Sequence, residues 1–370
     1  MSMTSRQNVA GLISGTGYER VGVFEHFWAE VLRNWTDADR FPEVTDDSGK
    51  KTPGDIFNHF DLDMRLIWSP IDHFPLKGFT EVVEETDEWV ASRNGAGAVL
   101  KLWKRKTSTP EHIDFRMIGR DIWDRDYRHY LVDLDLERID ARAAGRGIEK
   151  GEQRKQWVFY GDLFVWEVMR QSMGDFCMYE SLLLDPEWIL DFNRVYTDFY
   201  KAHYSALFEL QPKPDGIWIY EDLGYRNGLF CSLDVLERLI LPFYKEIVDF
   251  FHGYDLPVIL HSCGGIEAAL PLIIESGFDG LNPMEVKAGC DIYKFTEAYG
   301  DRLIFVGGLD VRIIETGDRD LIKRETTDLI NGMKDRGARF LFGSDHSITT
   351  GVTYDDYQYM LDVYRDTMWY

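Results

Sequence analysis

An imidazole and a thiol lie two residues apart at the end of a short apolar run. The run is Val258–Leu260, and it is followed by His261, Ser262 and Cys263 and then by two glycines. In an extended strand, residues i and i+2 point to the same face, so His261 and Cys263 face the same space. Both side chains are metal ligands of a kind that zinc accepts. The alternative is a buried free cysteine packed as a small apolar side chain beside a hydrogen-bonded histidine.

Carboxylates and imidazoles also follow the other short apolar runs of the chain. In a barrel of parallel strands, the active site forms at the carboxyl ends of the strands, so this placement predicts an enzyme site. The alternatives are structural: Asp310 as the cap of the next helix, Glu25 and His26 as hydrogen-bonded groups among aromatic residues, and the rest as loop residues. The residues in question are Glu25 and His26, Glu221 and Asp222, Glu285, Asp310, and Asp345 and His346.

These residue types predict a zinc site. A thiolate with imidazoles and a carboxylate suits zinc better than other common metals. We expect one ion held by His261 and Cys263, with Glu285 and His346 as further ligands, each at the end of a later strand. A catalytic zinc keeps one position for substrate or water.

Two neighbouring carboxylates are predicted to work beside the metal. Glu221 and Asp222 follow the apolar run Ile217–Tyr220. We expect them to line the mouth of the barrel and to orient the substrate or move protons, with Asp222 facing the metal without binding it. The alternative is a structural role, as carboxylates at a helix entry or in a turn, because Gly224 follows.

The elements that must position these residues alternate regularly from Gln156 onward. Short apolar runs are separated by stretches of helix length, such as 234–251 and 319–336. This pattern predicts a parallel sheet, and the chain length favours a closed (β/α)8 TIM barrel over an open sheet. We expect one domain overall. Residues 1–150 would form an irregular N-terminal extension and the first barrel elements, with a β-hairpin at 88–103, and residues 151–370 the main part of the barrel.

The composition limits the partners and the compartment. The chain has 370 residues and a formal net charge of −23, which argues against nucleic acid or an anionic membrane as a partner. No run approaches the roughly 20 apolar residues that span a bilayer, and no signal segment follows Met1. The four cysteines are far apart in a chain too large to need disulfides, so we expect a cytoplasmic protein.

The chain resembles the uroporphyrinogen decarboxylase-like superfamily, most clearly from about Tyr160 onward. The resemblance rests on four segments: Asp185-Pro186-Glu187, Glu221–Gly224, His261–Gly264 and Ser344-Asp345-His346. It implies a (β/α)8 barrel. One branch of the superfamily is the metal-free decarboxylase of a tetrapyrrole, and the other contains zinc-dependent methyltransferases that work with corrinoid proteins.

The His-x-Cys motif carries over from the methyltransferase branch as His261 and Cys263, and the acidic ligand as Glu285. In that branch a late cysteine usually completes the metal site, whereas this chain has His346 there, beside Asp345. Whether His346, Asp345 or Cys290 completes the site stays open.

The decarboxylase branch binds substrate carboxylates through an N-terminal Met-Arg-Gln-Ala-Gly-Arg segment. The similar segment Met169–Gly174 lies far too late in this chain. The resemblance therefore favours a zinc-dependent methyltransferase that acts on a small-molecule substrate (a thiol, a folate or a methoxy compound) and a corrinoid. The corrinoid (cobalamin) would be bound directly or on a partner corrinoid protein, and the superfamily makes a homodimer an expectation. The alternatives are a metal-dependent lyase or decarboxylase on the same fold, and a non-catalytic corrinoid-docking module.

Overall fold

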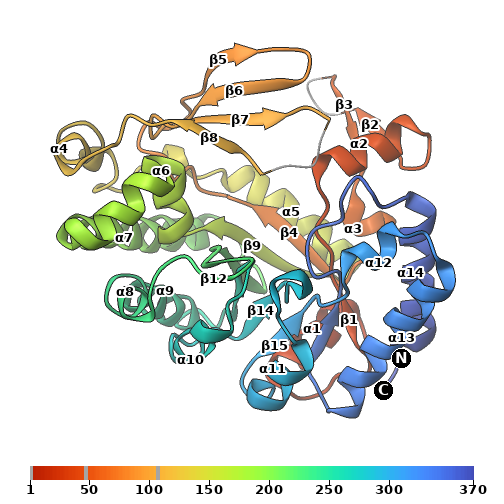
Figure 1. The fold of residues 1–370 in the computed structure, drawn as a ribbon. Coiled ribbons are helices and arrows are strands. Elements are labelled where there is room, and N and C mark those ends of the chain that lie inside the picture. Colours follow the sequence, from red (N-terminus) through yellow and green to blue (C-terminus); the bar gives the residue numbers. More distant parts are fainter. Residues whose placement is uncertain (1–2, 46–48, 106–108) are drawn as a thin grey trace.

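The core of the molecule is a sheet of eight parallel strands that curls into a barrel (Figure 1). A computed structural model describes residues 3–45, 49–105 and 109–370. The strands follow the order β1-β16-β15-β14-β13-β10-β9-β4, and helices alternate with them along the chain, so the predicted (β/α)8 TIM barrel is confirmed. The barrel strands are β1 (Gly22–Val23), β4 (Met64–Trp68), β9 (Trp157–Leu163), β10 (Gly216–Tyr220), β13 (Val258–His261), β14 (Gly280–Asn282), β15 (Ile304–Val306) and β16 (Phe340–Phe342).

The two end strands of this sheet, β1 and β4, are joined around Asp63. The amide of Asp63 donates to the carbonyl of Val23 at 3.1 Å, and its Oδ2 accepts from the amide of Val23 at 2.9 Å. The guanidinium of Arg20 pairs with the same carboxylate at 2.5 Å. A buried ion pair, one backbone hydrogen bond and one hydrogen bond from a backbone amide to a side chain therefore close the barrel between its first two strands.

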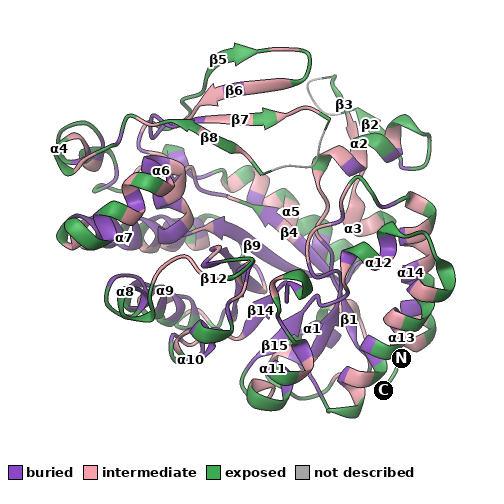
Figure 2. Ribbon diagram, viewed as in Figure 1, coloured by how far each residue is buried: buried purple, intermediate pink, exposed green. Residues whose placement is uncertain are grey.

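The strands have two apolar faces because side chains alternate along them. One face points into the barrel and carries Phe159, Trp218, Ile259 and Leu341. The other face packs against the surrounding helices, and the barrel strands are buried almost throughout (Figure 2). The helices are α1 (Ser5–Ser14), α2 (Ala29–Asp37), α3 (Ile56–His59), α4 (Arg120–Ile122), α5 (Ala141–Arg154), α6 (Val165–Leu184), α7 (Pro186–Leu210), α8 (Leu233–Leu239), α9 (Leu241–His252), α10 (Leu270–Glu275), α11 (Ile292–Tyr299), α12 (Val311–Glu315), α13 (Arg319–Asp335) and α14 (Tyr354–Thr367).

The N-terminal part adds small antiparallel sheets to the barrel. The predicted hairpin is confirmed as β6 and β7, which are the middle strands of a four-stranded sheet on one side of the barrel (Figure 1). The turn between them is held by Asn94, whose Oδ1 accepts from the amides of Ala96 and Ala98 and whose Nδ2 donates to the carbonyl of Gln171 on α6. The strands of this part are β2 (Glu43–Thr45), β3 (Lys51–Pro53), β5 (Glu81–Glu85), β6 (Trp89–Arg93), β7 (Val99–Trp103) and β8 (Glu111–Asp114), and a short pair, β11 (Gly224–Tyr225) with β12 (Gly228–Leu229), follows β10.

The helix expected over 234–251 is two helices. α8 ends at Leu239 and α9 begins at Leu241, with Pro242 in its first turn, where a missing amide hydrogen costs nothing. No helix in the described part of the chain is long and apolar enough to cross a membrane. All four cysteines are free thiols.

Candidate metal centre

Three side chains converge at the carboxyl ends of β10 and β13. The nearest ligand atoms of Asp222, His261 and Cys263 all lie within 4.8 Å of one another. Cys263 Sγ is 3.4 Å from His261 Nε2, and Asp222 Oδ1 is 3.7 Å from the same nitrogen. The structure therefore brings His261 and Cys263 together as the sequence predicts.

Asp222 is closer to this pair than the sequence analysis expected. Its Oδ1 accepts from the amide of Cys263 at 2.9 Å, and its side chain is 36% exposed. The expectation was a carboxylate that faces the metal without binding it. Its position instead makes Asp222 a candidate third ligand.

The spacing of the three groups fits a tetrahedral metal ion. Metal–ligand distances of about 2.3 Å for sulfur and 2.0–2.1 Å for nitrogen place two such ligands about 3.5 Å apart at a tetrahedral angle. The separations of 3.4 and 3.7 Å around His261 Nε2 are close to that value. Sulfur, nitrogen and carboxylate donors are also the set that zinc prefers.

The ring of His261 is oriented for binding by Asn282 on the neighbouring strand. His261 and Asn282 are register partners between β13 and β14. The Asn282 Nδ2 donates to the carbonyl of Val306 at 3.0 Å, so its Oδ1 faces His261 and accepts from Nδ1 at 2.6 Å. This bond places the ring hydrogen on Nδ1 and leaves the lone pair of Nε2 directed at Cys263 and Asp222.

The thiol of Cys263 needs a cation to ionise. Burial raises its pKa well above the usual value, and the carboxylates of Asp222 and Glu285 raise it further. A thiol in these surroundings stays protonated at neutral pH unless a positive charge lies beside it. A metal ion would supply that charge.

The other two predicted ligands, Glu285 and His346, are not part of the group formed by Asp222, His261 and Cys263. Glu285 Oε2 accepts from the amide of Gly264 at 2.6 Å, and its Oε1 pairs with Lys287 at 3.2 Å. The ring of His346 stacks against that of Trp28 at 6.2 Å between centroids. Burial lowers the pKa of His346, and the charges of Lys287 and His261 lower it further, which places His346 within electrostatic range of the site.

The two alternatives for completing the site are engaged elsewhere. Asp345 accepts from the amides of Val286 and Val311, both at 2.9 Å, and burial raises its pKa to about 6. Its carboxylate therefore ties two loops together. The thiol of Cys290 contacts the carbonyl of Gly264 at 3.3 Å, and burial raises its pKa to about 11.

Glu221 is turned away from this group toward α6. It is fully buried, and it accepts from the amides of Phe164, Trp166 and Glu167 and from the hydroxyl of Tyr244 at 2.6–3.0 Å. These are the unpaired donors at the start of a helix, so the contacts of Glu221 are those of a helix cap. Its predicted catalytic role stays a prediction.

Two other carboxylates at strand ends, Asp310 and Glu25, make the structural contacts that the sequence analysis gave as the alternative to a site role. Asp310 caps α12 by accepting from the amide of Arg312 at 3.0 Å. Glu25 accepts from the amide and hydroxyl of Ser344 at 2.9 and 2.7 Å and from the amide of His26 at 3.0 Å. Burial raises the pKa of Glu25 to about 8.

Two further residues lie beside His261: His26, which the sequence analysis named among the strand-end residues without assigning it to the metal site, and Tyr220. The ring of His26 lies 5.8 Å from that of His261, and its Nε2 is 2.7 Å from the hydroxyl of Tyr220. Burial holds the pKa of His26 well below its usual value, so its ring is neutral. His26 directly follows the apolar residues of β1, but its aromatic neighbours favoured a structural role. Tyr220 gave no signal in the sequence, because it is the last residue of an apolar strand.

The comparisons with known proteins agree with this architecture. Residues 215–367 match the family model described as uroporphyrinogen decarboxylase (URO-D). The matched segment runs from just before β10 into α14. A solved structure described as a methyltransferase from Methanosarcina mazei shares the fold, with a TM-score of 0.70 and 14% sequence identity over 99% of both chains.

Other likenesses are weak or absent. A crystal structure of a Xaa-Pro dipeptidase with bound methionine has a TM-score of 0.32 and 11% identity over 60% of this chain and 56% of that chain, too low to bear on fold or function. No curated protein matches this chain in sequence.

The arginine of the segment that resembles the decarboxylase motif is already paired. Arg170 on α6 donates to Glu167 at 2.6 Å and to Asp175 at 2.7 Å. Near the N-terminus, Arg20 is committed to Asp63 and to barrel closure. Each of these two guanidiniums is therefore already paired with a carboxylate of this chain.

Proposed function

We propose that the protein is a zinc-dependent methyltransferase that moves a methyl group between a small substrate, such as a thiol, a folate or a methoxy compound, and a corrinoid. The observation that carries this proposal is the convergence of Asp222, His261 and Cys263 at the carboxyl ends of two barrel strands. The similarity in fold to a Methanosarcina mazei methyltransferase supports it. The corrinoid would be bound by this chain or by a partner protein.

The three converging residues would hold the metal. His261 offers Nε2 because Asn282 fixes its ring, and Cys263 offers a thiolate once a cation offsets its burial. Glu285 and His346 remain proposed as further groups around the ion. Bound zinc supplies Lewis acidity, which lowers the pKa of a sulfur or oxygen of the substrate.

The remaining residues would act on the substrate. The side chain of Asp222 is partly exposed at the barrel mouth. Its carboxylate would therefore contact the substrate as well as the metal. The neutral ring of His26 and the hydroxyl of Tyr220 form a hydrogen-bonded pair beside His261, suited to positioning a polar group of the substrate.

A carboxy-lyase is the second candidate, because the family model that matches residues 215–367 is that of a decarboxylase. The two reactions differ in their products. Purified zinc-loaded protein should transfer methyl groups between cobalamin and one of a panel of thiols, folates and methoxy compounds, and release no carbon dioxide from carboxylated substrates. Carbon dioxide release without methyl transfer would favour the lyase, and metal uptake without either reaction would favour a docking module.

The variant Cys263→Ser links the reaction to the site. A hydroxyl is a far poorer zinc ligand than a thiolate at neutral pH, so methyl transfer should be lost. Cys177→Ser is the matched control, because Cys177 lies on α6 and contacts Ser181 rather than the group of three. Equal activity in the two variants would separate the reaction from the metal centre.

A further inference from the structure

A row of basic side chains runs along the outer face of α5. Arg142, Arg146, Lys150 and Arg154 follow one another at intervals of four residues, and all four are exposed. Residues four apart are neighbours on the surface of a helix, so the four cations form one stripe that is about 18 Å long. We call this row the α5 stripe. It stands out in a chain whose formal net charge is −23.

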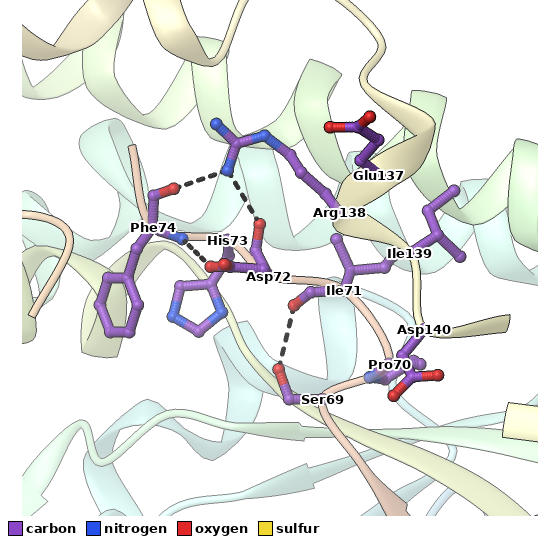
Figure 3. Close-up of a pocket in the computed structure, with 10 residues that line it drawn as sticks. All are labelled: Ser69, Pro70, Ile71, Asp72, His73, Phe74, Glu137, Arg138, Ile139 and Asp140. Carbon is purple, nitrogen blue, oxygen red and sulfur yellow. Dashed lines mark hydrogen bonds between the residues drawn. The ribbon is translucent and has the colours of Figure 1, made fainter. Parts of the chain in front are cut away.

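The position of α5 places the stripe on the side of the barrel. On the opposite face of the helix, Ala144, Ile148 and Gly151 are buried against the barrel strands β4 and β9. Asp140, which caps the helix, donates its backbone amide to the carbonyl of Pro70 at 2.9 Å, just after the carboxyl end of β4 (Figure 3). The stripe therefore runs from the edge of the barrel mouth toward the opposite end of the barrel.

None of the four cations has a carboxylate partner among the described residues. On other helices, basic residues pair with acidic ones at the same spacing, as in Arg194–Asp198 and Arg238–Asp234. The α5 stripe instead places like charges beside one another, and such pairs oppose helix formation. The stability of the helix therefore gives no reason for the stripe.

Neighbouring carboxylates leave the stripe positively charged. Glu149, which precedes Lys150, accepts from Nε2 of Gln153 at 3.2 Å. Asp55 lies within electrostatic range of Lys150, but its carboxylate is paired with the guanidinium of Arg65 at 2.9 Å. The stripe is thus a local positive potential on an otherwise acidic protein.

The stripe ends beside a hollow in the surface. Lys155 follows Arg154 directly, is exposed, and has no carboxylate partner in the part of the chain that the structure describes. It lines a hollow of about 860 Å³ whose other lining residues lie within 3–19, on and beside α1. A further cation therefore extends the basic surface to the edge of a concave region.

We propose that the α5 stripe is a docking surface for an acidic segment of a partner protein. A helix with a glutamate at every fourth position would present carboxylates at the same interval as the cations of the stripe. A nucleic acid or an anionic membrane is an extended anion, so it would also meet the acidic remainder of the surface and be repelled. The stripe is suited to a short acidic segment that is held on one face.

Fluorescence anisotropy with a labelled helical peptide tests this surface. The peptide is alanine-based, about five turns long, and carries a glutamate at every fourth position; a second peptide carries glutamine at those positions. The full-length protein should bind the glutamate peptide with a sub-millimolar Kd at about 0.01 M salt. Binding should weaken at about 0.15 M salt, where the Debye length has fallen from about 30 Å to about 8 Å. The glutamine peptide should bind at least about fivefold more weakly at low salt.

Paired variants place the binding on α5. Arg146→Gln together with Lys150→Gln should weaken binding of the glutamate peptide by about fivefold or more, because two charge pairs are lost. The matched control is Lys323→Gln together with Arg324→Gln, which removes two exposed cations from α13 and changes the net charge equally. The Kd of the control should equal that of the wild type. Both variants should melt within a few degrees of the wild type, because glutamine has a helix propensity similar to those of lysine and arginine.

Several results would overturn the proposal. These are no binding of the glutamate peptide by the wild type, equal binding of the two peptides, and an equal loss of binding in the α5 variant and the control. A much lower melting temperature in the α5 variant alone would assign the stripe to the stability of the helix. If a single-stranded oligonucleotide or vesicles with phosphatidylserine bind the wild type more tightly than the peptide does, and the α5 variant loses that binding, the stripe serves an extended anion instead.

Discussion

His261 donates its Nδ1 hydrogen to Oδ1 of Asn282, across two neighbouring barrel strands, at 2.6 Å. The opposite end of the Asn282 amide is held by the carbonyl of Val306. The chain therefore fixes which nitrogen of His261 is free before any ligand arrives. A histidine whose tautomer is set in this way loses less freedom on binding a metal.

Asn282→Ala should weaken metal binding by about 10- to 100-fold, the usual effect of removing the hydrogen-bond partner of a ligating histidine. The ring of His261 would then be free to rotate and to change tautomer. Competitive titration of zinc against a chromogenic chelator measures the change in Kd. An unaltered Kd would mean that Asn282 does not orient the ligand.

Asn193→Ala is the control for the loss of a buried amide. Asn193 lies on α7, and its Nδ2 donates to the carbonyl of Leu239 at 2.8 Å. It should lose a comparable stability, about 1–3 kcal/mol, with no change in zinc affinity. A fall in zinc affinity here would show that the effect of Asn282→Ala is a general consequence of destabilisation.

Asp222→Asn should lower both metal affinity and turnover. The neutral amide oxygen is a weaker ligand than a carboxylate, and turnover should fall by roughly two to four orders of magnitude. Zinc content and initial rates on one preparation measure both effects. Glu285→Gln should change zinc affinity less, because Glu285 lies outside the group of three. Full zinc content in Asp222→Asn would return Asp222 to the role that the sequence analysis expected, beside the metal without binding it.

The barrel closure depends on Arg20. The Arg20 side chain is 13% exposed and that of its partner Asp63 is 1% exposed. Arg20→Met should lower the free energy of unfolding by about 3–5 kcal/mol, because it leaves a buried carboxylate without its charge partner. Arg6→Met, which breaks the more exposed pair with Asp215, should cost about 1 kcal/mol or less. Urea denaturation compares them, and equal losses would contradict the role of Arg20.

The stability of the protein should fall as pH rises from about 6.5 to 8. Burial raises the pKa of Asp162 from 3.8 to about 8, so between these values the folded state binds the extra proton and stability falls with pH. Burial lowers the pKa of His73 from 6.5 to about 4, so His73 contributes the opposite slope between these values. Below pH 6.5 the contributions of Asp162 and His73 to the pH dependence of stability oppose each other. Above pH 6.5 only the contribution of Asp162 is left of these two. Asp162→Asn should make the decrease in the free energy of unfolding between pH 6.5 and 8 smaller. If the free energy of unfolding depends on pH in the same way in the variant and the wild type, the raised pKa of Asp162 is contradicted.

The barrel could be predicted from the sequence where strands are uniformly apolar. Six runs from Trp157 onward correspond to β9, β10, β13, β14, β15 and β16. β4 was missed because Arg65 interrupts its apolar residues. That guanidinium is buried all the same, since Asp55 and Gln156 pair with it, and such distant partners leave no local signal in the sequence.

The candidate site was only partly predictable for a similar reason. His261 and Cys263 share one strand end, so the alternation of side chains was enough to place them together. Whether Asp222 or Glu285 turns toward them depends on loop conformations after two other strands. The role of Asn282 depends on the register of β13 with β14, which apolar patterning does not fix.

The metal content of Cys263→Ser tests the central claim most directly. Purified wild-type protein should contain close to one zinc ion per chain by mass spectrometry of the metals, and Cys177→Ser should match it. Cys263→Ser should lose most of its zinc while it remains folded by circular dichroism, because the thiolate is the strongest donor of the group of three. A Cys263→Ser variant that keeps its full complement of zinc would contradict the metal centre at the ends of β10 and β13.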